Sequence, residues 1–375
     1  MALIPAPVAQ IAQKAQSKLA EKSVRAQIAS SSRELEQADT VLFFAEGPGQ
    51  FYQLEVWMET FTRLAESGLK VGVVLMDARS ARRVLETTEL PLLFSHSIER
   101  IETRLRAMGT GSICYVNNSQ RNFTMLRFNG PAHVHLNHGE SEKVSMVSHQ
   151  LKAYDYACVA GPAAVDRIKE SVTRFDGSTL VQIGRPQLDG LKPAELNSKI
   201  RVLYAPTWEG DSAAMDYSSL LDYGERILAQ LAADENFEVH FRPHPKTGDA
   251  SAAAKKAVSA LKSNYSHLLD PIHDPGQSLV WADVAICDTS AMAYDAIALN
   301  VPLILAGERE SKLRGGLPSA QLLGHANGIA DRVTQLASSG VSGRQKQLSQ
   351  YFFATTAPGA ATQKLGDLLR SFPPV

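Results

Sequence analysis

The stretch "DVAICDTSAMAYDAIALNVPLILAG", residues 283–307, contains a strand, a helix and a second strand in direct succession. Its two apolar runs, 283–288 and 301–307, are short and nearly continuous, which is typical of strands buried on both faces. Residues 290–300 between them have the length and composition of a helix. Strands that alternate with helices in this way predict an α/β fold with a parallel sheet.

The same alternation continues on both sides of this stretch. In the first half, we predict strands at 40–47, 70–77, 112–118, 132–138 and 156–161, and helices at 50–68, 119–128, 141–154 and 162–175, with a polar connection over 78–111. In the second half, further strands are predicted at 201–208 and 237–245, and helices at 217–233, 250–263, 343–353 and 360–371. The Pro- and Gly-containing segment 184–199 between the halves predicts a linker.

The sequence therefore predicts two doubly wound, Rossmann-like α/β domains that face a cleft. We expect a helical lead-in at 1–38, a first domain at 39–190, a second domain at 195–345 and C-terminal helices at 346–375. A length of 375 residues agrees with two domains. In such sheets ligands bind outside the carboxyl ends of the strands.

Composition narrows the class of protein. The chain has 44% hydrophobic and 21% charged residues, and its 38 Lys and Arg residues nearly balance its 39 Asp and Glu residues, so we expect no nucleic-acid partner. Cys114, Cys158 and Cys287 lie in or beside apolar runs and predict buried thiols in a reducing compartment.

The N-terminus lacks the layout of a signal peptide, and no apolar stretch reaches the ~18–20 residues that span a bilayer. We expect a cytoplasmic protein. Lys14, Lys18, Lys22 and Arg25 recur at helical spacing in the lead-in. This helix would either rest on the anionic inner face of a membrane or pack on its own domain, and the sequence leaves both open.

The first unusual strand end is "HLNHGESEK", residues 135–143. We predict that His138 ends its strand and that Gly139 provides a sharp turn. A metal site built on His135 and His138 has no third ligand at a familiar spacing, so we predict no metal there. A strand-end histidine is either catalytic or structural.

Two further strand ends suit an anionic ligand. In "FRPHP", residues 241–245, Arg242 and His244 lie two apart and would grip phosphate oxygens, unless the segment is simply a charged surface loop. In "CDTS", Asp288 ends a strand and Thr289 and Ser290 begin a helix, whose free N–H groups favour an anion. The same residue types are also ordinary helix caps.

The remaining candidates are more ambiguous. Trp208 in "LYAPTW", residues 203–208, would stack on a base or sugar, or it would serve only in packing. Asp295, on the helix after Ser290, would reach a ribose hydroxyl or face solvent. The segment "EGPGQ", residues 46–50, lacks the third glycine of a dinucleotide-binding fingerprint, so we expect no such cofactor there.

Taken in order, these motifs resemble the CDP-glycerol glycerophosphotransferase family of teichoic acid primases and polymerases. The resemblance rests on His138-Gly139 with Lys143, on "GRPQLD" with Gly184, Pro186 and Asp189, on "LYAPTW" with Thr207 and Trp208, on "RPHP", and on "CDTSAMAYD" with Asp288, Ser290 and Asp295. It spans residues 135–302 and lies mostly in the second domain.

The resemblance implies a GT-B fold, with the donor nucleotide mainly in the second domain and the acceptor in the first. His138 would be the base that deprotonates an acceptor hydroxyl, and His244 would stabilise the transition state. Donor contacts would come from Arg242, Thr207, Trp208, Asp288, Thr289, Ser290 and Asp295. Gly139 would form the turn, Lys143 would be a further phosphate contact, and Gly184 and Asp189 belong to the shared "GRPQLD" motif. The donor would be CDP-glycerol or a related CDP-polyol, and the acceptor a lipid-linked polymer or glycan of the cell wall or capsule.

The chain departs from the family pattern at three places. Glu140-Ser141-Glu142 replaces an uncharged run, Gln187 an arginine, and Ala291 a serine. Two other functions fit the same pattern: a GT-B glycosyltransferase or epimerase that uses a nucleotide sugar, and a non-catalytic GT-B-like binding subunit. Presence of both histidines favours an enzyme over the latter. The sequence does not decide the polyol, the acceptor or the need for a divalent cation.

Overall fold

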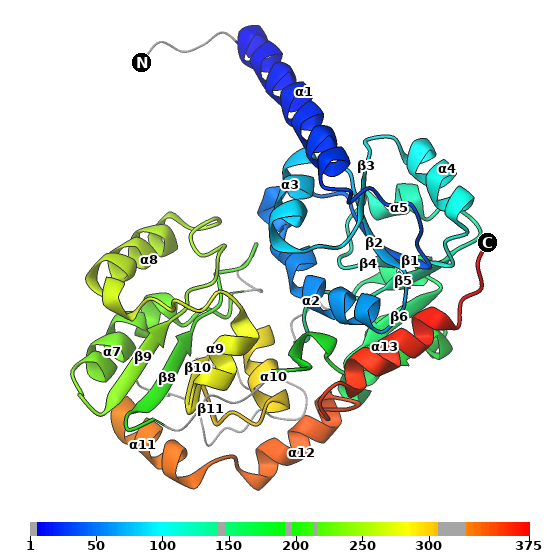
Figure 1. Cartoon of the computed structure of the whole chain (residues 1–375). Helices are drawn as coiled ribbons and strands as arrows, with labels where there is room; N and C mark the ends of the chain where they lie inside the picture. The colour runs from blue at the N-terminus through cyan, green and yellow to red at the C-terminus, as the bar shows by residue number, and fades with distance from the viewer. Residues whose placement is uncertain (1–5, 142–146, 192–196, 213–215, 307–327) are drawn as a thin grey trace.

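The chain folds around two separate parallel sheets, one in each half of the sequence (Figure 1). The computed structural model describes residues 6–141, 147–191, 197–212, 216–306 and 328–375, with side chains from residue 18 onward. The seven-stranded first sheet has the order β3-β2-β1-β4-β5-β6-β7, and the four-stranded second sheet has the order β11-β10-β8-β9. This confirms the predicted α/β class.

The first sheet is built around β1 (Thr40–Phe44), which pairs with β2 on one side and β4 on the other. Its other strands are β2 (Val71–Leu75), β3 (Leu92–Phe94), β4 (Ser112–Tyr115), β5 (Ala132–His135), β6 (Tyr156–Val159) and β7 (Leu180–Gln182). The strand order reverses direction between β1 and β4. This is the topological switch point of the sheet.

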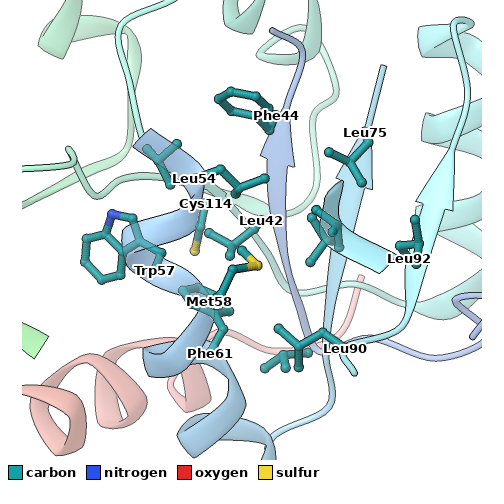
Figure 2. Packing of buried hydrophobic residues seen from close by; sticks show 14 of the residues in the cluster. Leu42, Phe44, Leu54, Trp57, Met58, Phe61, Leu75, Leu90, Leu92 and Cys114 are labelled. Atoms are coloured by element: carbon teal, nitrogen blue, oxygen red, sulfur yellow. The ribbon is translucent and has the colours of Figure 1, made fainter. Parts of the chain in front are cut away.

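Alternate residues of β1 point into two different hydrophobic clusters, so both faces of the sheet are covered. Leu42 and Phe44 pack under α2 (Tyr52–Glu66), with Trp57, Met58 and Phe61 (Figure 2). On the other face, Val41 and Phe43 pack in a second cluster with residues of α4 (Ile98–Met108). Burial of each such large side chain contributes about 1.5–3 kcal/mol.

The segment 78–111 is not the polar connection that the sequence predicts. It contains α3 (Ala78–Thr87), the short strand β3 and α4. The prediction is wrong because α3 is polar on most of its surface and buries a narrow face that includes Ala81 and Val84. The remaining elements of the first half are η1 (Pro48–Gln50), α5 (Asn122–Met125), η3 (His149–Ala153), α6 (Pro162–Ser171), η4 (Gly177–Thr179) and η5 (Pro186–Leu188).

The second sheet has its switch point between β8 (Ile200–Ala205) and β10 (Val284–Cys287). Its outer strands are β9 (Phe237–Phe241) and β11 (Leu303–Leu305). The helices around it are α7 (Leu220–Ala232), α8 (Ala252–Asn264), η6 (Ser266–Leu268), α9 (Pro275–Trp281), α10 (Ala291–Ala298) and α11 (Ile329–Ser339).

After the second domain the chain returns to the first. Helix α12 (Gly343–Phe352) contacts both α10 and α6, and α13 (Ala360–Arg370) contacts α2 (Figure 1). Leu365 and Leu369 of α13 belong to the core cluster of the first domain. A Cβ at Gly161 would lie 2.6 Å from the carbonyl oxygen of Phe352, so the returning chain crosses at a position that requires glycine.

Helix α1 (Ala6–Ser30) projects from the first domain, and only its C-terminal part reaches α3 (Figure 1). Val24 and Ile28 are buried there, whereas Leu19 is exposed. In the part of the chain with described coordinates, no helix is both long enough and apolar enough to cross a membrane.

Candidate active site

His138 lies in the loop after β5, at the junction of the two domains. The strand ends at His135, so the prediction that His138 is the last strand residue is wrong. The left-handed residue of the turn is Asn137, with φ 61°, rather than Gly139. A Cβ at Gly139 would lie 3.2 Å from the Cβ of Ala291, so this glycine allows the loop to approach helix α10 of the second domain closely.

The His138 ring is held in one tautomer. Its Nδ1 lies 3.2 Å from the carbonyl oxygen of Val116, which only accepts, so Nδ1 carries the proton and Nε2 keeps its lone pair. Trp57 fixes the same loop, because its Nε1–H donates to the carbonyl oxygen of Asn137 at 2.6 Å. Burial lowers the pKa of His138, and the positive charges of Arg185 and Lys246 act in the same direction against the Val116 hydrogen bond, so that the pKa is about 4. The ring is therefore neutral at pH 7.

His244 is held in the opposite tautomer. The backbone N–H of Lys246 donates to its Nδ1 at 3.1 Å, so the proton of the neutral ring is on Nε2. The backbone N–H of His244 donates to the carbonyl oxygen of Pro206 at 3.2 Å. Its ring stacks on Trp208, with centroids 6.2 Å apart and planes inclined by 19°.

Tyr52, at the start of α2, connects the two histidines. Its ring meets His138 edge-on at a centroid distance of 5.9 Å and His244 at 6.3 Å. Lys246 Nζ lies 5.9 Å from the Tyr52 ring centroid and 5.1 Å from that of Trp208. A cation is thus held between aromatic rings of both domains, beside both histidines.

The switch point of the second sheet carries a helix start. Asp288, fully buried, accepts from the backbone N–H of Thr207 at 2.7 Å and of Ser219 at 3.1 Å, so it ties the ends of β8 and β10 together. Half-buried Thr289 precedes Ser290, the N-cap of α10. The Ser290 hydroxyl is buried and makes no hydrogen bond to any described residue. A buried hydroxyl without a hydrogen bond, at the N-cap of a helix, suits an anionic ligand.

Arg242 makes its contacts within the second domain. Its guanidinium donates to Asp270 at 2.8 Å, to Ser278 at 3.1 Å, and to the carbonyl oxygens of Ile272 and His273 at 2.6 Å. These bonds anchor the end of β9 to the segment before α9. The contacts indicate that Arg242 positions the His244 loop, and its predicted grip on phosphate stays a prediction.

Asp295 of α10 pairs with Arg185 across the domain junction. Two parallel hydrogen bonds of 2.9 Å join the guanidinium to the carboxylate, and both side chains are about nine-tenths buried. Such a bidentate pair fixes orientation as well as charge. The predicted contact of Asp295 with a ribose stays a prediction.

Gly184 and Asp189 contact the returning chain. Gly184 has φ 84°, and a Cβ there would lie 3.0 Å from Thr355. The carboxylate of Asp189 accepts from the backbone N–H of Thr362 at 2.6 Å, in the first turn of α13. These two residues thus support the domain arrangement. Lys143 lies outside the described residues.

Glu140, the first residue of the acidic run 140–142, has a structural partner. Glu140 forms an ion pair with Arg167 of α6, and each side chain is only 7% exposed.

His135 is buried against Tyr154, with ring centroids 5.0 Å apart, and burial lowers its pKa to about 3. Among the residues that the structure describes, no group of three His, Cys, Asp or Glu side chains is placed to hold a metal ion.

Four residues of this junction were missed from the sequence: Tyr52, Arg185, Glu209 and Lys246. Arg185 and Lys246 were available as neighbours of quoted motifs, in "GRPQLD" and directly after "RPHP". The buried Glu209 carboxylate follows Trp208 and accepts from the N–H groups of Gly248, Ala250 and Ser251, each at 3.0 Å, so it shapes the loop that carries Lys246. Tyr52 has no motif, because only folding brings it to the histidines.

A family model described as CDP-glycerol:poly(glycerophosphate) glycerophosphotransferase matches residues 114–310. The chain belongs to this family. The match covers more than half of the sequence and includes the loops of both histidines. The resemblance stated from the motifs is therefore confirmed, and the chain is a glycerophosphotransferase-type enzyme by family.

Two solved structures of low identity share the fold over most of the chain. A structure of the wall teichoic acid polymerase TagF is 12% identical, with a TM-score of 0.57 and 98% coverage of both chains. A putative UDP-N-acetylglucosamine 2-epimerase from Listeria monocytogenes is 11% identical, with a TM-score of 0.58 over 88% of this chain and 95% of that one. At these identities the likeness concerns the fold, and it confirms the GT-B-like architecture. No curated protein sequence matches the chain.

Proposed function

We propose that this glycerophosphotransferase family member transfers glycerol phosphate, or a related polyol phosphate, from a CDP-linked donor to a hydroxyl group of a cell-wall or capsule polymer. The observation that carries the proposal is the pair of histidines, one from each domain, packed on Tyr52 in opposite tautomers. One ring offers a lone pair and the other a proton, as transfer of a phosphoryl group to a hydroxyl requires.

In the proposed reaction, His138 Nε2 takes the proton of the acceptor hydroxyl. The hydroxyl oxygen forms a bond to the β-phosphorus of the donor while the bond from that phosphorus to CMP breaks. His138 afterwards returns its proton to solvent. Its low pKa keeps it unprotonated at neutral pH, and a bound diphosphate would raise that pKa by offsetting Arg185 and Lys246.

The donor is assigned to the switch point of the second sheet. Its diphosphate would lie against the start of α10 near Ser290, with Lys246 and the Nε2–H of His244 offsetting charge that builds up in the transition state. Trp208 and Thr207 would border the nucleoside. Asp288 and Arg242 act as positioning residues, since their carboxylate and guanidinium hold these loops in place.

The acceptor is proposed to be a lipid-linked or glycan chain, reached from the first domain. Peripheral contact of α1 with the inner face of a membrane stays a prediction. The exposed Leu19 agrees with it, whereas the buried Val24 and Ile28 show that the C-terminal part of the helix packs on its own domain.

The test measures CMP release from CDP-glycerol by the purified full-length chain, with CDP-ribitol and UDP-N-acetylglucosamine as competing donors. We expect release from a CDP-polyol, and loss of at least about 100-fold in His138→Ala and in His244→Ala. His96→Ala is the matched control, because His96 is exposed and contacts Glu21 and Phe94 rather than the site residues. Wild-type rates of CMP release in both His138→Ala and His244→Ala, with unchanged thermal unfolding, would refute this mechanism. Turnover of UDP-N-acetylglucosamine alone would show that the enzyme uses a nucleotide sugar.

A further inference from the structure

The switch point of the first sheet carries a second group of polar side chains, which the proposed donor site does not use. It lies between the carboxyl ends of β1 and β4, where the strand order reverses. Ligands of doubly wound sheets bind at this place. The equivalent switch point of the second sheet, between β8 and β10, is the one assigned above to the donor.

Four half-buried residues form a continuous row here: Glu46 after β1, Gln53 on α2, and Asn117 and Ser119 after β4. The Ser119 hydroxyl donates to a Glu46 carboxylate oxygen, and the amide of Asn117 donates to Gln53 Oε1 at 2.9 Å. The Gln53 amide in turn donates to the hydroxyl of Tyr52 at 3.3 Å. We call these four residues the amide row.

The amide row adjoins the proposed base. Val116, whose carbonyl oxygen holds His138 Nδ1 at 3.2 Å, directly precedes Asn117. Tyr52, whose ring touches that of His138, directly precedes Gln53. A ligand bound along the row would therefore present an end to His138.

The chemistry of the row selects the class of ligand. Two amides, a hydroxyl and one carboxylate provide donors and acceptors together, as neighbouring hydroxyl groups require. None of the four carries a positive charge, so a bare anion gains no ion pair from them. We propose that the amide row is the acceptor subsite and that it binds the polyhydroxy end, polyol or sugar, whose hydroxyl is to be phosphorylated. This inference rests on the proposed function for its catalytic meaning.

The experiment compares Gln53→Met and Glu46→Gln with the control Gln120→Met. Gln120 is exposed, lies next to Ser119 and is outside the row. Ligand-observed NMR would measure binding of glycerol 3-phosphate, glycerol and inorganic phosphate to each full-length protein. Kinetics of CMP release from CDP-glycerol would give the KM for glycerol 3-phosphate as acceptor and the KM for the donor separately.

We expect Gln53→Met and Glu46→Gln to weaken binding of glycerol 3-phosphate and of glycerol about tenfold or more, and to raise the acceptor KM equally, with the donor KM within twofold of wild type. Gln120→Met should change neither. Unchanged polyol binding in both row variants overturns the inference, as does inorganic phosphate competing as well as glycerol 3-phosphate. Absence of CMP release from wild type refutes the proposed function instead, and the NMR measurement still decides whether the row binds polyols.

Discussion

Removing one partner of the buried Glu140–Arg167 ion pair should destabilise the first domain strongly. Both side chains are 7% exposed, so a single replacement removes the oppositely charged partner of a buried group. Such a loss costs about 3–5 kcal/mol. In a domain of this size about 1 kcal/mol shifts Tm by about 2–4 °C, so Glu140→Leu should lower Tm by at least about 6 °C.

The double variant Glu140→Leu/Arg167→Met tests whether the loss of stability comes from an unbalanced buried charge or from altered packing at these two positions. Apolar replacement of both partners removes the buried charge together with its desolvation cost, so the double variant should recover most of the lost Tm. Glu102→Gln is the control, because the Glu102–Arg106 pair is exposed on the surface of α4 and contributes less than about 1 kcal/mol. Circular dichroism at pH 7 measures all four proteins. A Tm loss in Glu140→Leu no larger than in the control, or a double variant no better than the single one, would refute the reasoning.

Two further predictions concern pH and the crossing chain. Burial lowers the pKa of His133, that of His135 to about 3 and that of His138 to about 4, so between these values and the usual pKa near 6.5 the unfolded chain binds more protons than the folded one. The free energy of unfolding should therefore fall as the pH drops through this window and stay flat above it. Urea unfolding at pH 7.5 and at pH 5 checks this, and equal stability at both would contradict it. Protonation of His138 should also lower kcat/KM for CMP release below about pH 5. Gly161→Ala should lower the free energy of unfolding by about 1–3 kcal/mol or more, because the new Cβ would lie 2.6 Å from the backbone carbonyl oxygen of Phe352. Gly343→Ala is the control, because open space surrounds Gly343, and its Tm should stay the same or rise slightly. Equal changes of Tm in the two variants would contradict the argument that the chain crosses at Gly161.

Local pattern was sufficient for most of the fold. The mainly apolar runs at 40–44, 71–75 and 284–287 are strands within a few residues of their predicted bounds, because strands buried on both faces are nearly continuously apolar. The pattern failed for α3, β3 and α4, since three residues are too short to recognise and a helix with a narrow buried face looks polar. It also missed α9, α11 and β7, which are short or lie in mixed segments.

The site divides in the same way. The sequence predicts His138, His244 and Ser290 as site residues because each follows a strand, and strands can be located from the sequence. Arg242 and Asp288 were found for the same reason, but their contacts show that they position loops. Tyr52 could not be found, because its significance depends on two rings that lie 86 and 192 positions further along the chain.

The sequence by itself determined the α/β class, the two-domain order and the family, since these depend on periodicity and on ordered motifs. The tertiary structure alone decided which charges pair. Arg185 with Asp295 and Glu140 with Arg167 are separated by 110 and 27 positions, and no local rule relates them. It also decided the tautomers of His138 and His244, because each depends on one backbone group that folding brings to Nδ1. "HLNHGESEK" thus supplies a histidine, but the fold keeps its ring neutral and fixes its tautomer.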